Sequence, residues 1–539
     1  MDYFYTYPFT TLSPALIIWD VPYFTKGEIS IRNLKFTQWI AVPLVLLMVV
    51  LTGCQDVGGV DVNQAMVNNT NVKSGESKQS MHINIEPDKQ FATERDLEII
   101  KQINSFSLDI DHAKMKDANT ASIKGSLSME GMKLPFHLSM DKYGIFIDVD
   151  GAQKPVYLSL DALGGAEMPL PVDTKELEKQ LEELSPKVLT FVMKHLSNPK
   201  NISVTSVQEA VYGETLSLNK LHIEMNGEEM LAMVKPFLTS IAKDEQGLKQ
   251  IIGDLYDVLY PVFETVSSLE GMEADELSSI VPATKEEAVT AMYSLIKEGL
   301  DSILAEYDQE LNNLLTSIPE LKTVFGPETK LNMDFFLDNK LDIRKQNMSL
   351  KVALPASEDL PVRAVTISSD SELWNIGGAV TVDEVQAPQG VIELEEGKVT
   401  PGQVLRNFDP NSVVYPFLKN EMRITTKSIF LNPEQEESVT VKNTTFVPLR
   451  YLSEELDAEV KWTKGSKQIV VTDDITGDEI VMTVGSPKAT VAGQEVTMVE
   501  SPFVGSDGKT YVPLRFIAES LGATVEKEQG TGWIFIDRP

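Results

Sequence analysis

Two segments near the C-terminal end of this 539-residue chain match each other at an offset of 65 residues. Residues 445–458 and 510–523 share the order Thr, aromatic, Val, Pro, Leu, Arg, aromatic, followed by Glu and Leu at the same spacing. In each copy the apolar residues fall on one helical face, and the Arg and the Glu are four residues apart, where their side chains can pair. A repeat of this kind constrains both copies to the same small unit. We expect a short strand, a two-turn helix and a strand in each.

Individual motif positions have predicted structural roles. Pro513 is expected at the first helical residue, where a missing N–H is tolerated, and Gly522 just after the helix, where the backbone favours glycine. An anionic polymer could bind Arg450 and Arg515, but the Glu partner in each copy favours a structural role. The residues to which we assign that role are Val447, Pro448, Leu449, Arg450, Glu454 and Leu456 in the first copy, and Val512, Pro513, Leu514, Arg515, Glu519, Leu521 and Gly522 in the second.

This pattern resembles the copper amine oxidase N-terminal, or stalk, domain of Gram-positive surface proteins, over about residues 423–539. The resemblance implies an exported, accessory α+β module with two repeat units. The first copy departs from the pattern, with Asp457 at the position of Gly522. In that family the oxidase chemistry belongs to a separate catalytic domain, which needs a Tyr after Asn and a His-x-His pair. Neither occurs here, so we expect no enzyme activity, no metal and no cofactor.

A second informative stretch is Leu51-Thr52-Gly53-Cys54. It closes an apolar run that begins at Trp39 and follows several basic residues, an order typical of a secretory signal. The stretch resembles the lipobox of bacterial lipoproteins, which implies a diacylglycerol on Cys54 and a signal peptide over residues 1–53, with an N-terminal part longer than usual. A signal-anchor helix is the alternative, but a membrane span needs about 20 apolar residues and this run is shorter.

Charge and cysteine content narrow the possible partners. The formal net charge is −33, which argues against nucleic acid, since nucleic-acid binding needs a basic surface, and against adhesion to anionic head groups. We therefore expect membrane attachment through the lipid anchor, whose two acyl chains hold stably, on the extracytoplasmic face. Cys54 is the only cysteine, so no disulfide framework is possible.

The rest of the chain predicts a tether, a central domain and a linker. Residues 54–90 are polar without apolar periodicity, which favours a flexible tether. Residues 91–386 predict an α+β domain, whether one unit or two divided near residue 173 or 271, with helices segregated onto one face of a large, curved antiparallel sheet. Residues 387–422 predict a linker to the stalk domain. The strands expected in the central domain are 105–110, 121–129, 134–140, 144–149, 155–160, 202–208, 214–225, 330–337, 342–353, 362–370 and 372–385, and the helices are 94–102, 173–194, 227–269 and 284–315.

Two functions remain open at this point. The first is non-catalytic binding or scaffolding at the envelope, with the stalk units contacting a wall polymer or a surface protein. The second is carriage of a lipid or another apolar ligand by the central sheet, because the element order is similar to that of lipoprotein-carrier proteins. The side chains that could line such a pocket, or equally form ordinary core, are Met225, Met230, Leu231, Met233 and Leu238.

Overall fold

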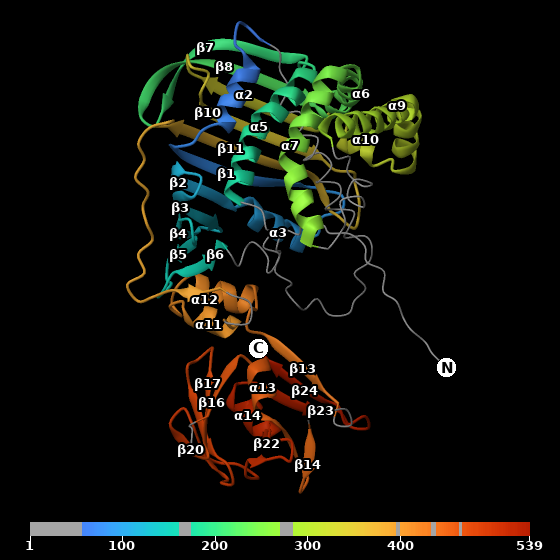
Figure 1. Ribbon diagram of the computed structural model, residues 1–539. Helices are drawn as coiled ribbons and strands as arrows, with labels where there is room; N and C mark the ends of the chain where they lie inside the picture. The colour runs from blue at the N-terminus through green and yellow to red at the C-terminus, as the bar shows by residue number, and fades with distance from the viewer. Residues whose placement is uncertain (1–55, 161–173, 270–283, 395–398, 433–437, 463–465) are drawn as a thin grey trace, which may run out of the picture.

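A computed structural model describes residues 56–160, 174–269, 284–394, 399–432, 438–462 and 466–539 (Figure 1). The predicted signal peptide and the lipobox residues Leu51, Thr52, Gly53 and Cys54 lie outside these ranges. None of the helices in the described ranges is long and apolar enough to cross a membrane.

The larger part of the molecule is a twelve-stranded sheet, in the order β12-β6-β5-β4-β3-β2-β1-β11-β10-β9-β8-β7. All neighbouring strands are antiparallel except β12 and β6, which are parallel. The strands are β1 (Gly75–Pro87), β2 (Ser107–Asp117), β3 (Thr120–Met129), β4 (Met132–Met140), β5 (Gly144–Val149), β6 (Val156–Ser159), β7 (Asn201–Val211), β8 (Glu214–Asn226), β9 (Lys330–Leu337), β10 (Ile343–Ala353), β11 (Val362–Trp374) and β12 (Ile392–Glu393).

Helices gather on one face of this sheet, over β7 to β11 and β1 (Figure 1). They are α2 (Val62–Thr70), α3 (Glu94–Asn104), α5 (Thr174–His195), α6 (Gly227–Lys243), α7 (Glu245–Leu269), α9 (Lys285–Ser317) and α10 (Leu321–Val324). Ala65 of α2 and Met230 of α6 are buried in one core with Leu221, Met333 and Leu350 of the sheet. The predicted α+β class, with segregated helices on a largely antiparallel sheet, is therefore confirmed.

Local sequence explains where several helices begin. Thr93 and Asp96 form a reciprocal capping box at α3, in which the Thr93 amide donates to the Asp96 carboxylate at 2.9 Å. Thr284 accepts a hydrogen bond from the Glu287 amide at the start of α9. Capping of this kind satisfies amides that have no partner within the helix.

The prediction of a flexible tether over residues 54–90 is wrong for its larger part. Residues 62–70 form α2, and residues 75–87 form β1, which lies between β2 and β11 in the sheet. The apolar side chains of β1 (Met81, Ile83 and Ile85) alternate with polar ones. One face of β1 is solvated, so the strand contains too few apolar residues to stand out in the sequence.

The segment after β11 also differs from its prediction. A further strand was expected over residues 372–385, but β11 continues only to Trp374, where Asn375 adopts a positive φ of 51° and ends the ladder. The chain then crosses the polar face of the sheet, where the amide of Asp383 donates to Ser122 and that of Val385 to Ser139. The alternating pattern that predicted a strand after Trp374 therefore comes from contact with the face of the sheet and not from pairing with another strand.

The predicted linker, residues 387–422, contains β12, α11 (Pro401–Arg406), α12 (Val414–Pro416) and the π-helical turn η1 (Phe417–Glu421). Asn407, just after α11, is buried, and its side chain exchanges hydrogen bonds with the backbone of Lys154 at 2.8 and 3.0 Å. The segment therefore packs against the central domain.

The C-terminal domain contains three small sheets, ordered β13-β24-β23, β14-β15-β22-β21 and β16-β17-β18-β19-β20. The strands are β13 (Lys427–Leu431), β14 (Val439–Val441), β15 (Thr444–Pro448), β16 (Ala458–Trp462), β17 (Gln468–Asp473), β18 (Glu479–Thr483), β19 (Lys488–Val491), β20 (Gln494–Thr497), β21 (Phe503–Val504), β22 (Thr510–Pro513), β23 (Thr524–Lys527) and β24 (Ile534–Arg538). Helices α13 (Leu449–Glu455) and α14 (Leu514–Ser520) complete the two copies. Each copy is thus the strand, short helix and strand that the repeat predicts.

The two copies are related by a local pseudo-twofold axis. β15 pairs antiparallel with β22, and Val447 lies opposite Val512, its equivalent in the other copy. The flanking pairs, Phe446 with Pro513 and Pro448 with Tyr511, are symmetric about that point. The repeat therefore builds one domain by self-pairing rather than two units in series.

Candidate binding sites

The apolar residues of the repeat motif form the core of the C-terminal domain. Val447, Leu449, Leu456, Val512, Leu514 and Leu521 are all buried in a single cluster. Pro448 and Pro513 are the residues before the helices rather than their first residues, with φ near −57°, so the predicted position of Pro513 is wrong by one residue. Gly522 has a φ of 77°, the left-handed conformation expected after α14.

The Arg and Glu of each motif pair as their spacing predicts. Arg450 donates to Glu454 at 2.8 Å, and Arg515 donates to Glu519 at 3.0 Å. All four side chains are largely exposed, so each pair contributes only about 0.3–0.5 kcal/mol.

A buried ion pair joins the two copies. Arg538 donates two hydrogen bonds to the carboxylate of Asp473, at 2.8 and 2.7 Å, and the side chains are 5% and 6% exposed. The two residues are 65 positions apart and are equivalent in the repeat. A third hydrogen bond runs from Arg538 to the carbonyl of Leu456 at the end of α13. Removing one partner of such a pair leaves a buried charge, at a cost of about 3–5 kcal/mol.

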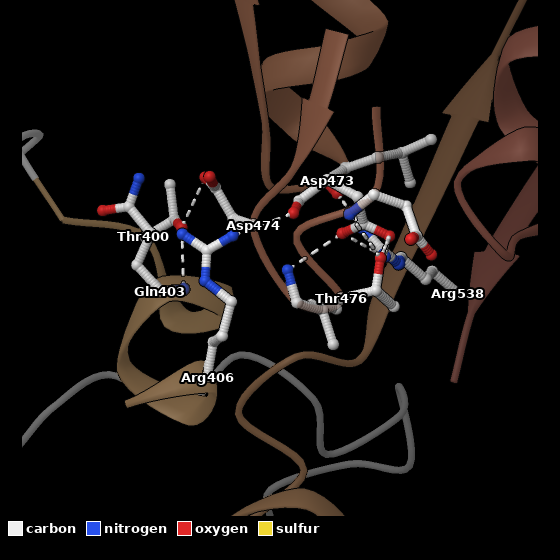
Figure 2. A network of polar contacts seen from close by, with 10 residues as sticks. Thr400, Gln403, Arg406, Asp473, Asp474, Thr476 and Arg538 are labelled. Atoms are coloured by element: carbon white, nitrogen blue, oxygen red, sulfur yellow. Dashed lines mark hydrogen bonds and ion pairs between the residues drawn. The ribbon is translucent and has the colours of Figure 1, made fainter. Parts of the chain in front are cut away.

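Asp473 and the next residue, Asp474, also face α11. Figure 2 shows Thr400, which caps the start of α11, and Arg406 at its end facing these two residues. The Thr400 hydroxyl donates a hydrogen bond of 2.8 Å to the Asp474 carboxylate. Arg406 donates to the carbonyl of Asp473 at 3.4 Å, and Gly402 packs directly on Asp474. Since Asn407 binds the central domain, α11 joins the two domains.

Asp457 occupies the position of Gly522 in the first copy. It adopts a positive φ of 51° and is 2% exposed, with one carboxylate oxygen 3.2 Å from the Lys427 ammonium and the other without a hydrogen-bond partner. Burial raises the pKa of Asp457, and the nearby Lys427 and Arg538 charges oppose the rise. The ionised form of the Asp457 side chain is therefore less stable at this buried position than in water.

An open groove lies beside α13. It has a volume of about 480 Å³ and is lined by Pro448, Leu449, Arg450, Tyr451, Glu454, Val460, Trp462, Gly508, Lys509 and Thr510. Trp462 is 45% exposed, and its indole presents an apolar face together with an N–H donor.

Residues 429–536 match the family model described as copper amine oxidase N-terminal domain. The chain carries that domain at its C-terminal end. The two motif copies, both short helices and the residues that line the groove beside α13 all lie within the matched range. No curated protein matches the chain.

A second groove lies in the central domain, between α6 and α9. Its volume is about 660 Å³, and Ser302, Glu306, Tyr307 and Glu310 are the polar side chains that line it. The others are apolar: Leu231, Val234, Ile303, Leu311, Leu314, Leu315, Leu321 and Phe325. Ligand sites of about 300–1,000 Å³ are typically apolar with a few polar groups. This groove has that composition and size.

The groove between α6 and α9 continues into a more polar half. A neighbouring hollow of about 700 Å³ shares Leu231, Tyr307 and Leu311 with it and adds Glu228, Lys235, Asp308 and Lys322. Lys235 lies 2.5 Å from Asp308 and 5.7 Å from the Tyr307 ring. Burial, and then the charge of Asp308, raises the pKa of Tyr307. The two halves together suit an amphipathic molecule.

The apolar face of the sheet is unevenly covered. At one end Leu221, Met333 and Leu350 are buried under the helices, whereas Leu127, Phe136 and other apolar residues of β2 to β6 on the same face are only half-buried. Register places Leu127 between Leu108 and Leu134. The helical layer therefore leaves apolar sheet surface accessible.

The predicted pocket residues divide between core and groove. Met225, Met230 and Met233 are buried in the main core. Leu231 lines the groove between α6 and α9, and Leu238 is half-buried. Of the predicted residues only Leu231 of α6 lines this groove, whereas Met225 of β8 and Met230 and Met233 of α6 belong to the ordinary core. The α9 residues of the groove, such as Ile303 and Leu314, were missed because an amphipathic helix alone does not say which face is left uncovered.

The histidines have separate partners. His112 lies 2.6 Å from Glu76, His222 lies 2.7 Å from Asp334, and His195 is buried beside Asp244. Burial lowers the pKa of His195, and Asp244 opposes the change. Among the residues that the structure describes, no group of three or more His, Cys, Asp or Glu side chains is placed to hold a metal ion.

Proposed function

We propose that this protein is a non-catalytic lipoprotein, anchored through Cys54 to the extracytoplasmic face of a Gram-positive membrane, whose central domain binds an amphipathic, lipid-like ligand. The observation that carries the ligand proposal is the groove between α6 and α9. One half is mostly apolar, with Glu306 and Glu310 as its charged residues, and the other half is more polar. An acyl chain fits the first half by burial of apolar surface, and a polar head group fits Lys235, Lys322 and Asp308. The lipobox sequence supports the anchor.

The test uses residues 56–539, secreted without the lipid anchor, and native mass spectrometry for co-purifying lipid, followed by titration with a fluorescent fatty acid. Substituting Ile303→Ser together with Leu314→Ser is expected to weaken binding about ten-fold or more, because both side chains line the groove. They are 53% and 45% exposed, so the fold tolerates the change.

Leu295→Ser is the matched control. Leu295 lies on the same helix, is 73% exposed and does not line either half of the groove. Equal binding by the double variant and the control would contradict the proposal, as would a clean apo mass with no response to the fatty acid.

A second candidate function is binding or scaffolding at the envelope through the C-terminal domain, to a wall polymer or a surface protein. The groove beside α13, with its exposed Trp462, favours it. The net charge of −33 disfavours a nucleic-acid partner for either function.

A further inference from the structure

We propose that the groove beside α13 binds an oligosaccharide strand built of pyranose sugars. The inference gives the envelope-binding function its ligand chemistry, and it does not depend on the lipid site of the central domain. The groove holds about 480 Å³ and is partly open to solvent.

The side chains of the groove match the two sides of a sugar ring. Trp462, the last residue of β16, and Tyr451 of α13 are 45% and 37% exposed, and both line the groove. Aromatic faces carry partial negative charge and so attract the C–H groups on the face of a pyranose. Arg450 and Glu454, paired at 2.8 Å, offer a donor and an acceptor side by side for neighbouring hydroxyls.

Comparison of the two copies argues that Trp462 is not required by the fold. At an offset of 65 residues, Lys527 stands where Trp462 does, and Thr444 where Lys509 does. Most core residues and the Arg–Glu pair are the same in both copies, although Leu452 corresponds to Ile517. Because the second copy folds into the same unit with Lys527 at this position, the fold does not need Trp462. The groove itself is lined by residues of both copies, since Lys509 and Thr510 also face it.

The surroundings of the groove favour a sugar over a peptide that adds as a strand. β16 is the edge strand of its sheet, where such a peptide would pair. Its exposed residues Glu459 and Lys461 form an ion pair at 2.6 Å. Charged side chains along an edge discourage strand addition, whereas a sugar needs only the aromatic face and the polar groups.

The experiment is calorimetric titration of residues 56–539 with an N-acetylglucosamine tetramer and a glucose tetramer, alongside sedimentation with purified wall glycan. Trp462→Ala is expected to raise Kd about ten-fold or more, and Trp462→Phe to restore part of the affinity. Trp533→Ala removes another exposed Trp of the same domain, and Arg515→Ala breaks the equivalent ion pair of the second copy. Both controls are expected to leave Kd within about two-fold.

Each outcome has a distinct meaning. No binding of either tetramer, or binding that Trp462→Ala leaves unchanged, overturns the groove proposal. Sedimentation with the wall that survives Trp462→Ala also overturns it while leaving envelope binding standing through another surface. The groove proposal is supported if Trp462→Ala loses tetramer binding and sedimentation with the wall while both controls keep them, and if the unfolding curve of Trp462→Ala is unchanged.

Discussion

Asp457 and Gly522 occupy equivalent positions after the two repeat helices, and both have a positive φ. Glycine adopts this conformation freely, whereas an L-residue with a side chain meets steric resistance. Asp457 in addition buries a carboxylate whose second oxygen has no hydrogen-bond partner. The first copy is therefore less stable at this point than the second.

We expect Asp457→Asn to stabilise the C-terminal domain at pH 7. Burial raises the pKa of Asp457 in the folded state above the unfolded value of about 3.9. A carboxyl of this kind stabilises the fold while it is protonated, and that stability is lost as pH rises through the folded pKa. The variant does not titrate, so its advantage should be present at pH 7 and vanish below about pH 3.9.

Urea unfolding at a series of pH values measures this difference. Asp457→Gly separates the effect of the buried carboxylate from that of the positive φ, because it also removes the left-handed penalty of about 1–2 kcal/mol at every pH. A stability difference between Asp457→Asn and the parent that does not change with pH would contradict the assigned role of the carboxylate.

At the scale of elements, β1 shows how a central strand can escape notice in the sequence. Its residues 76–87 pair with β11 and its first half with β2, yet its sequence is mostly polar on the solvated face. Removing it would leave two long strand edges without partners, which exposes backbone groups to aggregation.

We therefore expect a chain beginning at residue 91 to be insoluble or to lose cooperative unfolding, whereas one beginning at residue 56 folds. The shorter chain also lacks α2, whose Val62 and Ala65 are buried in the core. The free energy of unfolding lost with α2 and β1 should exceed the entire stability of a typical domain, about 5–15 kcal/mol. Thermal unfolding followed by circular dichroism, with both chains prepared in parallel, measures it. Equal melting curves would show that β1 is dispensable.

Elements with strong local patterns were predictable from the sequence. β5 and β9 match their expected ranges, and α9 begins at the capping signal of Thr284. The Arg–Glu pairs were predictable because both partners lie within one helical turn. The Asp473–Arg538 pair and the α13 groove were not, because they arise when segments far apart in sequence come together across the pseudo-twofold axis.

At the scale of the whole molecule, α11 determines how the two domains meet. Asn407 fixes its end to the backbone of Lys154, and Thr400 binds Asp474 of the C-terminal domain. Figure 1 shows the helices of this segment between the large sheet and the C-terminal domain. The groove between α6 and α9 and the groove beside α13 are accordingly on two domains that α11 connects.

Gly402 tests this arrangement, because a side chain there would meet the opposing loop. A Cβ at position 402 would lie 2.9 Å from the Ile475 side chain and 3.1 Å from the Asp474 backbone carbon. We expect Gly402→Leu to separate α11 from the loop, at a cost of about 1–3 kcal/mol, and to enlarge the radius of gyration in small-angle X-ray scattering while each domain keeps its own unfolding transition. Gly299→Leu, in an open position on α9, should leave the scattering unchanged. An unchanged radius in Gly402→Leu would mean that contacts other than α11 hold the domains together.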